Sequence, residues 1–201
     1  TAVSDKEKSI TIAKSGNEIT FYYYKNVELT AQSDTKSYNG SEQSVSGYYV
    51  SGPSVITATF KGVTAGATGT DAGEYAAKFS EGTVGKLDTT DKYIVVGTVD
   101  GKLTITSITE KIVVTIQGNC ESAVYDGKEH TASGYEITDV TSSIYSARDF
   151  TFSGSAEAKR TDVGSTYMEL TDEQFTNINK NFSNVEFKIV DGELKITGDP
   201  V

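Results

Sequence analysis

The sequence has very few of the residues that cross-link small secreted domains or bind metal ions. It contains one cysteine, Cys120, and one histidine, His130, in 201 residues. A single cysteine excludes an intramolecular disulfide and any zinc site built from several thiolates. We expect Cys120 to be a small, partly buried residue at a strand end rather than a reactive thiol. The sequence predicts no cofactor, and no metal site.

Long apolar segments are also missing. No apolar run approaches the roughly 20 residues that a membrane-spanning helix requires, and the chain does not open with a signal peptide. We therefore expect no membrane insertion. We also interpret the sequence as a piece of a longer protein that carries its export and anchoring signals elsewhere.

Basic residues are in deficit: 18 Lys and Arg stand against 28 Asp and Glu, which gives a net charge of −10. A field of this sign repels nucleic acid and anionic membranes, and no Lys/Arg-rich run offsets it locally. Nucleic acid is therefore excluded as an expected partner.

Residues that favour strands and turns are abundant, with 12 Tyr and 19 Gly but only 2 Pro. Such a composition is typical of many short strands, and no segment shows a sustained helical period. The sequence therefore predicts an all-β, or mainly β, fold. Residues 171–175 (TDEQF) are the exception, because a threonine N-cap followed by two acids predicts one short helix or 3₁₀ turn.

One stretch occurs twice: residues 99–106 (VDGKLTIT) return as 190–197 (VDGELKIT), 91 residues later. An Asp-Gly pair between alternating apolar residues predicts a two-residue type I′ hairpin. Tyr-Asn-Gly at 38–40 and Tyr-Asp-Gly at 125–127 are separated by 87 residues. The second copy has thus gained four residues, which we place in a loop around 142–149.

The repeat divides the chain into two tandem β-domains, at 27–109 and 112–201. Residues 1–26 precede the repeat and are predicted to form an N-terminal β-hairpin, either packed on the first domain or left over from an upstream domain. Strand 18–24 carries aromatic side chains on both of its faces. This pattern fits either a strand covered on both sides or an exposed tyrosine stripe.

Two architectures compete for these domains. Residues 71–75 (DAGEY) have the form of the tyrosine corner of immunoglobulin-like sandwiches, in which the tyrosine hydroxyl bonds to the backbone upstream. In the second domain the spacing to Tyr167 is one residue longer. The immunoglobulin-like sandwich is favoured, and a β-grasp-like sheet with one short helix is the alternative.

The turn and strand motifs together resemble the MBG and YDG types of tandem repeat found in large bacterial cell-surface proteins. Residues 125–130 (YDGKEH) are close to the YDG-type signature, from which 38–43 (YNGSEQ) departs by Asn for Asp and Gln for His. Residues 19–26 look like the closing strand of a mucin-binding-type repeat. The resemblance covers about residues 27–199. It implies a secreted or wall-anchored, adhesin-like protein of a Gram-positive bacterium, with these units as stalk or ligand-presenting modules.

Catalytic chemistry is not expected. His130 is the only histidine and its counterpart in the first repeat is Gln43, so we interpret His130 as a hydrogen-bonding residue at a strand edge. Residues 88–91 (DTTD) could hold a cation weakly. An intramolecular isopeptide bond between a lysine and an Asn or Asp side chain stays open.

Two functions remain. The first is an adhesin-like module that binds a host protein, immunoglobulin included, or a glycan through exposed tyrosines. We name Tyr22, Tyr24, Tyr49 and Tyr145 as candidate ligand-binding residues. Tyr48, whose Gly-Tyr context recurs at 134–135, is expected in the core. The second function is a structural spacer with no ligand of its own. In both cases we expect a monomer within a longer multidomain chain.

Overall fold

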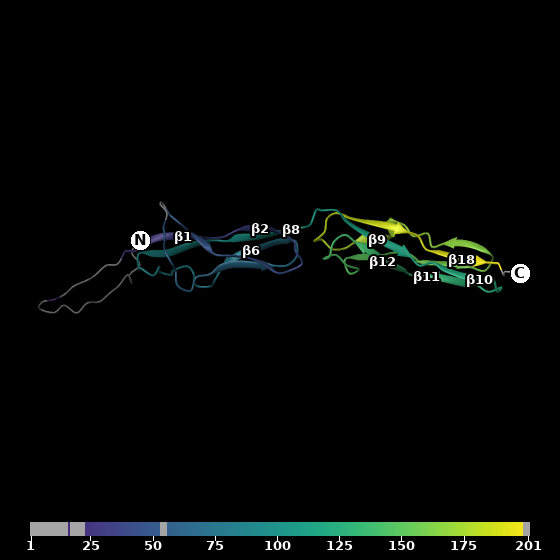
Figure 1. Cartoon of the computed structure of the whole chain (residues 1–201). Coiled ribbons are helices and arrows are strands. Elements are labelled where there is room, and N and C mark those ends of the chain that lie inside the picture. The colour runs from purple at the N-terminus through teal and green to yellow at the C-terminus, as the bar shows by residue number, and fades with distance from the viewer. Residues whose placement is uncertain (1–15, 17–22, 53–55, 199–201) are drawn as a thin grey trace. The chain divides into compact units, whose positions relative to one another are not determined.

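The computed structural model describes residues 16, 23–52 and 56–198. It consists of strands and one 3₁₀ helix, which confirms the all-β prediction (Figure 1). Its contacts separate two compact units, with a boundary between Thr106 and Ser107, and Tyr38–Gly40 groups with the second unit. No helix in the described ranges is long and apolar enough to cross a membrane.

In the described part of unit 1, eight strands form two sheets. The first sheet has the order β4-β1-β7 and the second has the order β2-β8-β6-β5-β3. The strands are β1 (Lys25–Ala31), β2 (Asp34–Ser37), β3 (Gln43–Ser46), β4 (Tyr48–Ser51), β5 (Ala65–Gly69), β6 (Gly73–Phe79), β7 (Tyr93–Val99) and β8 (Gly101–Thr106). Most of the predicted N-terminal hairpin lies outside the described residues, and β1 begins two residues before the expected start of the first domain.

Unit 2 repeats this plan with more interruptions. Its sheets have the orders β12-β9-β17, β10-β18-β15, β11-β14 and β13-β16. The elements are β9 (Ile112–Gly118), β10 (Glu121–Val124), β11 (His130–Ser133), β12 (Tyr135–Val140), β13 (Phe150–Phe152), β14 (Glu157–Arg160), β15 (Gly164–Tyr167), η1 (Asp172–Gln174), β16 (Phe175–Asn177), β17 (Val185–Val190) and β18 (Glu193–Thr197). The 3₁₀ helix η1 confirms the turn predicted at 171–175, and the N–H of Thr171 donates to Oε1 of Gln174 at 3.0 Å.

The first and last strands of each unit run side by side in the same direction. In unit 1, β1 pairs in parallel with β7, and β2 with β8. In unit 2, β9 pairs in parallel with β17, and β10 with β18. Each unit therefore has a parallel strand pair that passes from one sheet into the next.

The doubled Asp-Gly stretch is not a hairpin, which corrects the sequence-based prediction. β17 and β18 pair with β9 and β10 and not with each other. Neither Asp-Gly pair has the positive φ angles of a type I′ turn. A Cβ on Gly192 would lie 2.6 Å from the Asn119 carbonyl oxygen, and one on Gly101 would lie 2.2 Å from that of Gln32. Glycine is required because two backbones nearly touch where the strand pair changes sheets.

The cores follow the period-two alternation of the long strands. Ile112, Val114 and Ile116 of β9 are buried, and the residues between them are half-buried. The unit 1 core gathers around Leu29 on β1, with Phe60 packed against it in one cluster. Alternation places one face of each central strand inside.

The tyrosine corner is present in unit 1 only. The hydroxyl of Tyr75 donates to the Asp71 carbonyl oxygen at 2.8 Å. In unit 2 Tyr167 is 56% exposed, and the Arg160 guanidinium instead donates to the Asp162 and Val163 carbonyl oxygens at 2.7 and 2.9 Å. The choice between an immunoglobulin-like sandwich and a β-grasp-like sheet stays a prediction.

Candidate functional site

The four candidate tyrosines lie in different environments. Tyr22 falls outside the described residues. Tyr24 is half-buried just before β1, Tyr49 is 62% exposed on β4, and Tyr145 is only 4% exposed. Of the three described candidates, Tyr49 alone presents most of its ring to solvent.

Tyr145 was expected at the surface and lies in the core of unit 2. Its ring contacts Phe182 edge-on with centroids 5.0 Å apart, and its hydroxyl donates to Asn177 Oδ1 at 3.1 Å. Burial, aided by the negative charge of Asp149, raises the pKa of Tyr145 to about 12. The loop turns inward because the Asp149 carboxylate accepts hydrogen bonds from the backbone and the side chain of Ser146.

Tyr49 lies on the outward face of the sheet β4-β1-β7. Tyr48 and Val50 beside it pack toward the core, as expected for Tyr48, so alternation directs Tyr49 outward. Thr30 on β1 is opposite Tyr49 on one side and Val99 of β7 on the other. Val99 is 48% exposed.

A second row of residues completes this surface. Glu28 on β1 lies between Ser51 of β4 and Gly97 of β7. Gly97 has no side chain to rise above the sheet, and a Cβ there would meet the Glu28 carboxylate at 2.9 Å. We call this surface, formed by six residues, the Tyr49 face: Glu28, Thr30, Tyr49, Ser51, Gly97 and Val99. It presents an aromatic ring, a valine and one carboxylate, and it can stack on a sugar ring or pack against a protein.

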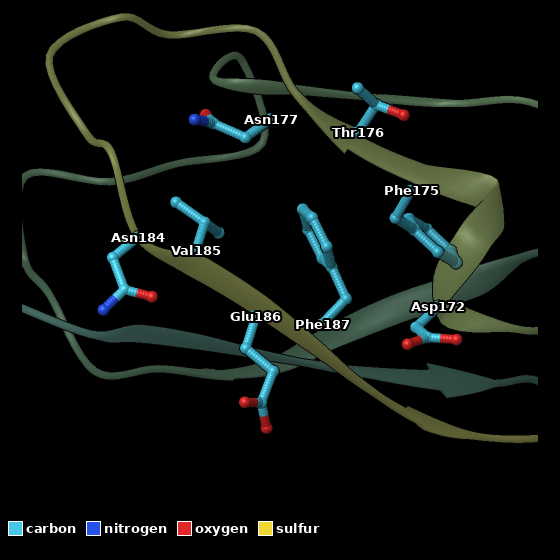
Figure 2. Close-up of a pocket in the computed structure, with 8 residues that line it drawn as sticks. All are labelled: Asp172, Phe175, Thr176, Asn177, Asn184, Val185, Glu186 and Phe187. Atoms are coloured by element: carbon cyan, nitrogen blue, oxygen red, sulfur yellow. The ribbon is translucent and has the colours of Figure 1, made fainter.

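An open depression of about 460 Å³ lies between β16 and β17 in unit 2. Figure 2 shows Val185 and Phe187 projecting from β17 into this space, with Glu186 on the opposite side of the strand. Phe187 stacks on Phe175 with centroids 5.6 Å apart. The eight lining residues are Asp172, Phe175, Thr176, Asn177, Asn184, Val185, Glu186 and Phe187. Residues 185–190 were not singled out from the sequence; their alternation could have predicted this strand, but the gap beside it arises from packing.

One of the two acids that line this depression, Glu186, is already paired. Glu186 forms an ion pair with Lys111, and the hydrogen bond from Lys111 lowers the pKa of the Glu186 carboxyl. No group of three or more His, Cys, Asp or Glu that could hold a metal ion occurs in the described part of the chain. The depression can accommodate a small ligand in volume, but none of the acid–base pairs described here converges on it.

His130 lies at the start of β11, at the strand edge where the sequence placed it. Its Nε2 is 2.9 Å from Asp126 Oδ1, which also accepts from the N–H of Lys128. The hydrogen bond from the Lys128 N–H, and to a smaller extent the one with His130, lower the pKa of the Asp126 carboxyl. In unit 1 the amide of Gln43 donates to the Ser37 carbonyl oxygen at 2.9 Å. Each residue secures the turn before its strand.

Asp88, the first acid of the proposed cation loop, is used by the chain itself. Its side chain is only 4% exposed. The carboxylate accepts hydrogen bonds from the N–H groups of Lys92 and Tyr93 at 2.7 and 2.8 Å, and from the hydroxyl of Thr90 at 2.5 Å. Its oxygens are therefore directed at backbone donors, and the loop geometry favours a structural role over cation binding.

Two further sequence expectations concern reactive side chains. Cys120 is exposed, not partly buried, because it lies in the short break between β9 and β10. No lysine in the described ranges is buried. A lysine in the interior, beside an acid and an Asn or Asp, is what the isopeptide hypothesis needs, so the structure gives that hypothesis no support.

Residues 112–198 match the MBG domain family model. The matched span runs from the first residue of β9 to just past the end of β18, and so covers the sheets of unit 2. The MBG domain is a domain type of extracellular surface proteins. The match covers less than half of the chain, and tandem MBG/YDG repetition and a Gram-positive origin stay predictions. No curated protein and no solved structure matches the chain.

Proposed function

We propose that the chain is a non-enzymatic segment of an extracellular surface protein, in which each unit acts as a spacer that carries other domains away from the surface. The observation behind this is the parallel pairing of first and last strands. In unit 2, Ile112 is opposite Val185 at one end of the pair, and Val124 is opposite Thr197 at the other. The chain therefore enters and leaves the unit at opposite ends, which is what a spacer requires.

Several expectations belong to this proposal. The net charge of −10 argues against nucleic acid as a partner. Attachment to a cell wall and action as a monomer are also part of this proposal. The non-enzymatic role rests on the sequence, which has a single histidine and no motif of a catalytic site.

Ligand binding is the second candidate, and the Tyr49 face is the observation that favours it. Exposed tyrosines give rigid contact area and a hydrogen-bonding tip, which are the properties of many binding hot spots. In this alternative the module is adhesin-like, and Tyr49 with its neighbours contacts a host glycan or a host protein such as immunoglobulin.

One experiment separates the two candidates. The whole chain is immobilised and its binding to purified immunoglobulin, mucin and a glycan array is measured. Tyr49→Ala is compared with Tyr167→Ala, which removes an equally exposed tyrosine from unit 2. Binding that Tyr49→Ala abolishes and Tyr167→Ala leaves intact would establish the ligand-binding role. If wild-type protein binds none of the probes, the spacer role stands.

A further inference from the structure

We propose that the parallel strand pair of each unit is a mechanical clamp, which lets the unit carry tension along the chain without unfolding. This inference rests on the proposed spacer function, because only a protein held at both ends experiences such tension. The clamp of unit 2 consists of β9 and β10 on one side and β17 and β18 on the other.

The clamp of unit 2 is bonded at both of its ends. At the entry end, the N–H of Ile112 donates to the Asn184 carbonyl oxygen at 2.9 Å. At the exit end, the N–H of Tyr125 donates to the Thr197 carbonyl oxygen at 2.9 Å. Between these two bonds, β9 pairs in parallel with β17, and β10 with β18, over most of the length of the clamp.

Tension reaches this clamp as shear. The chain enters at Ile112 and leaves at Thr197, which lie at opposite ends of two strands that run in the same direction. The force is therefore directed along the strands, whereas the hydrogen bonds between parallel strands cross the gap at even spacing. These bonds share the load and must yield together. If the same strands were pulled apart from one end, the bonds would open one after another.

The strands that receive the force are the best-anchored strands of their sheets. β9 is the central strand of β12-β9-β17, and β18 is the central strand of β10-β18-β15. Figure 1 shows β9 and β12 in one half of unit 2, and β18 and β10 in the other half. Each loaded strand is thus held by hydrogen bonds on both sides, in its own sheet.

Unit 1 contains the same arrangement. The N–H of Lys25 donates to the Lys92 carbonyl oxygen at 2.8 Å at the entry end, and Ser37 lies opposite Thr106 at the exit end. Its force-receiving strands, β1 and β8, are again bonded on both sides. The two units differ in loops, turns and surface residues, yet both keep the parallel pair and its central strands.

Single-molecule pulling on the full-length chain tests the clamp in unit 2. In a Cys120→Ser background, Glu110→Cys with Gly198→Cys places the handles at opposite ends of the clamp. Glu110→Cys with Asn184→Cys places both handles at its entry end. We expect the opposite-end handles to require a several-fold higher unfolding force at the same pulling speed, because forced unfolding reports the barrier for the loaded direction. Equal forces in the two geometries would overturn the clamp.

Two variants connect the force to the clamp rather than to stability in general. Gly192→Ala lies at the crossing inside the clamp. Arg160→Gly lies outside the clamp, at the end of β14, and removes the guanidinium that bonds to the following turn. We expect Gly192→Ala to lower the opposite-end unfolding force, and Arg160→Gly to leave it close to the wild-type value although both destabilise unit 2. A larger loss of force in Arg160→Gly would contradict the proposal. The pulling experiment contains no ligand, so its result tests the clamp. The binding experiment at the Tyr49 face tests the spacer role and leaves the measured unfolding forces unchanged.

Discussion

The hydroxyl of Tyr75 bonds to the carbonyl oxygen of Asp71 at 2.8 Å and closes the turn between β5 and β6. The equivalent turn of unit 2 has Thr166 in place of Tyr75, and Arg160 in place of Gly69. A Cβ on Gly69 would lie 2.3 Å from the Tyr75 ring, so the tyrosine needs the glycine beside it. The two units thus satisfy one equivalent turn carbonyl, that of Asp71 or Asp162, with different side chains, a phenol in one and a guanidinium in the other.

This relationship predicts a rescue. Arg160→Gly should lower the free energy of unfolding of unit 2 by about 1–3 kcal/mol, because hydrogen bonds from a charged donor are lost. Adding Thr166→Tyr should recover part of that loss by building the tyrosine corner of unit 1. Amide hydrogen exchange, read by mass spectrometry, follows each unit separately. If the amides of the double variant exchange as fast as those of Arg160→Gly, the glycine–tyrosine pair of unit 1 cannot replace the arginine–threonine pair of unit 2.

Asp88 should make unit 1 sensitive to acid. Burial alone would raise the pKa of this carboxyl, but the hydrogen bonds from Thr90, Tyr93 and Lys92 together hold it below the usual value of 3.8. Their stabilisation is therefore complete above about pH 4 and is lost as the pH falls through the lowered pKa. Asp88→Ala should cost unit 1 about 2–3 kcal/mol at neutral pH.

The control for this prediction is the pH series itself. The difference between wild type and Asp88→Ala, measured by urea unfolding of unit 1, should shrink as the solution is acidified below the usual carboxyl pKa. A difference that stays constant down to pH 2 would show that the carboxylate charge is not what organises this loop.

Gly192 should tolerate no side chain. A Cβ there would lie 2.6 Å from both the Asn119 carbonyl oxygen and the Met168 sulfur. Gly192→Ala should therefore destabilise unit 2 by about 1–3 kcal/mol, because two packed backbones must move apart. Gly198→Ala is the matched control, since nothing lies within 4 Å of a Cβ at Gly198. Thermal unfolding that affects both variants equally would mean that the strand crossing is looser than the structure shows.

Tyr145 should remain protonated in strongly alkaline solution. Its pKa is raised from 10.0 to about 12 by burial and by the charge of Asp149. The phenol form therefore stabilises the folded state fully below pH 10, and this contribution is lost as the pH rises toward 12. In a spectrophotometric titration, the tyrosine that Tyr145→Phe removes should be one that ionises near pH 12 in wild type. If the tyrosine lost from the titration is one that ionises near pH 10, Tyr145 lies at the surface.

The buried state of Tyr145 also shows where sequence reasoning fails. The four extra residues of the second repeat indicated a surface loop, and a tyrosine in such a loop was expected to face solvent. The loop instead folds over Phe150 and Phe182, because Asp149 and Asn177 supply hydrogen bonds to the loop and the phenol. Asn177 and Phe182 lie far from Tyr145 in the sequence, so local pattern did not reveal these contacts. Tyr49 was placed correctly because strand alternation alone decides its direction.

By itself, the sequence determined that this protein is all-β and that its second half repeats the motifs of its first. These properties depend on composition and internal repetition, which can be read without knowing any tertiary contact. The tertiary structure alone decided the role of the doubled Asp-Gly stretch. Both a tight turn and a strand crossing select glycine. A crossing differs in that a backbone distant in the sequence lies against the glycine, here that of Gln32 or Asn119.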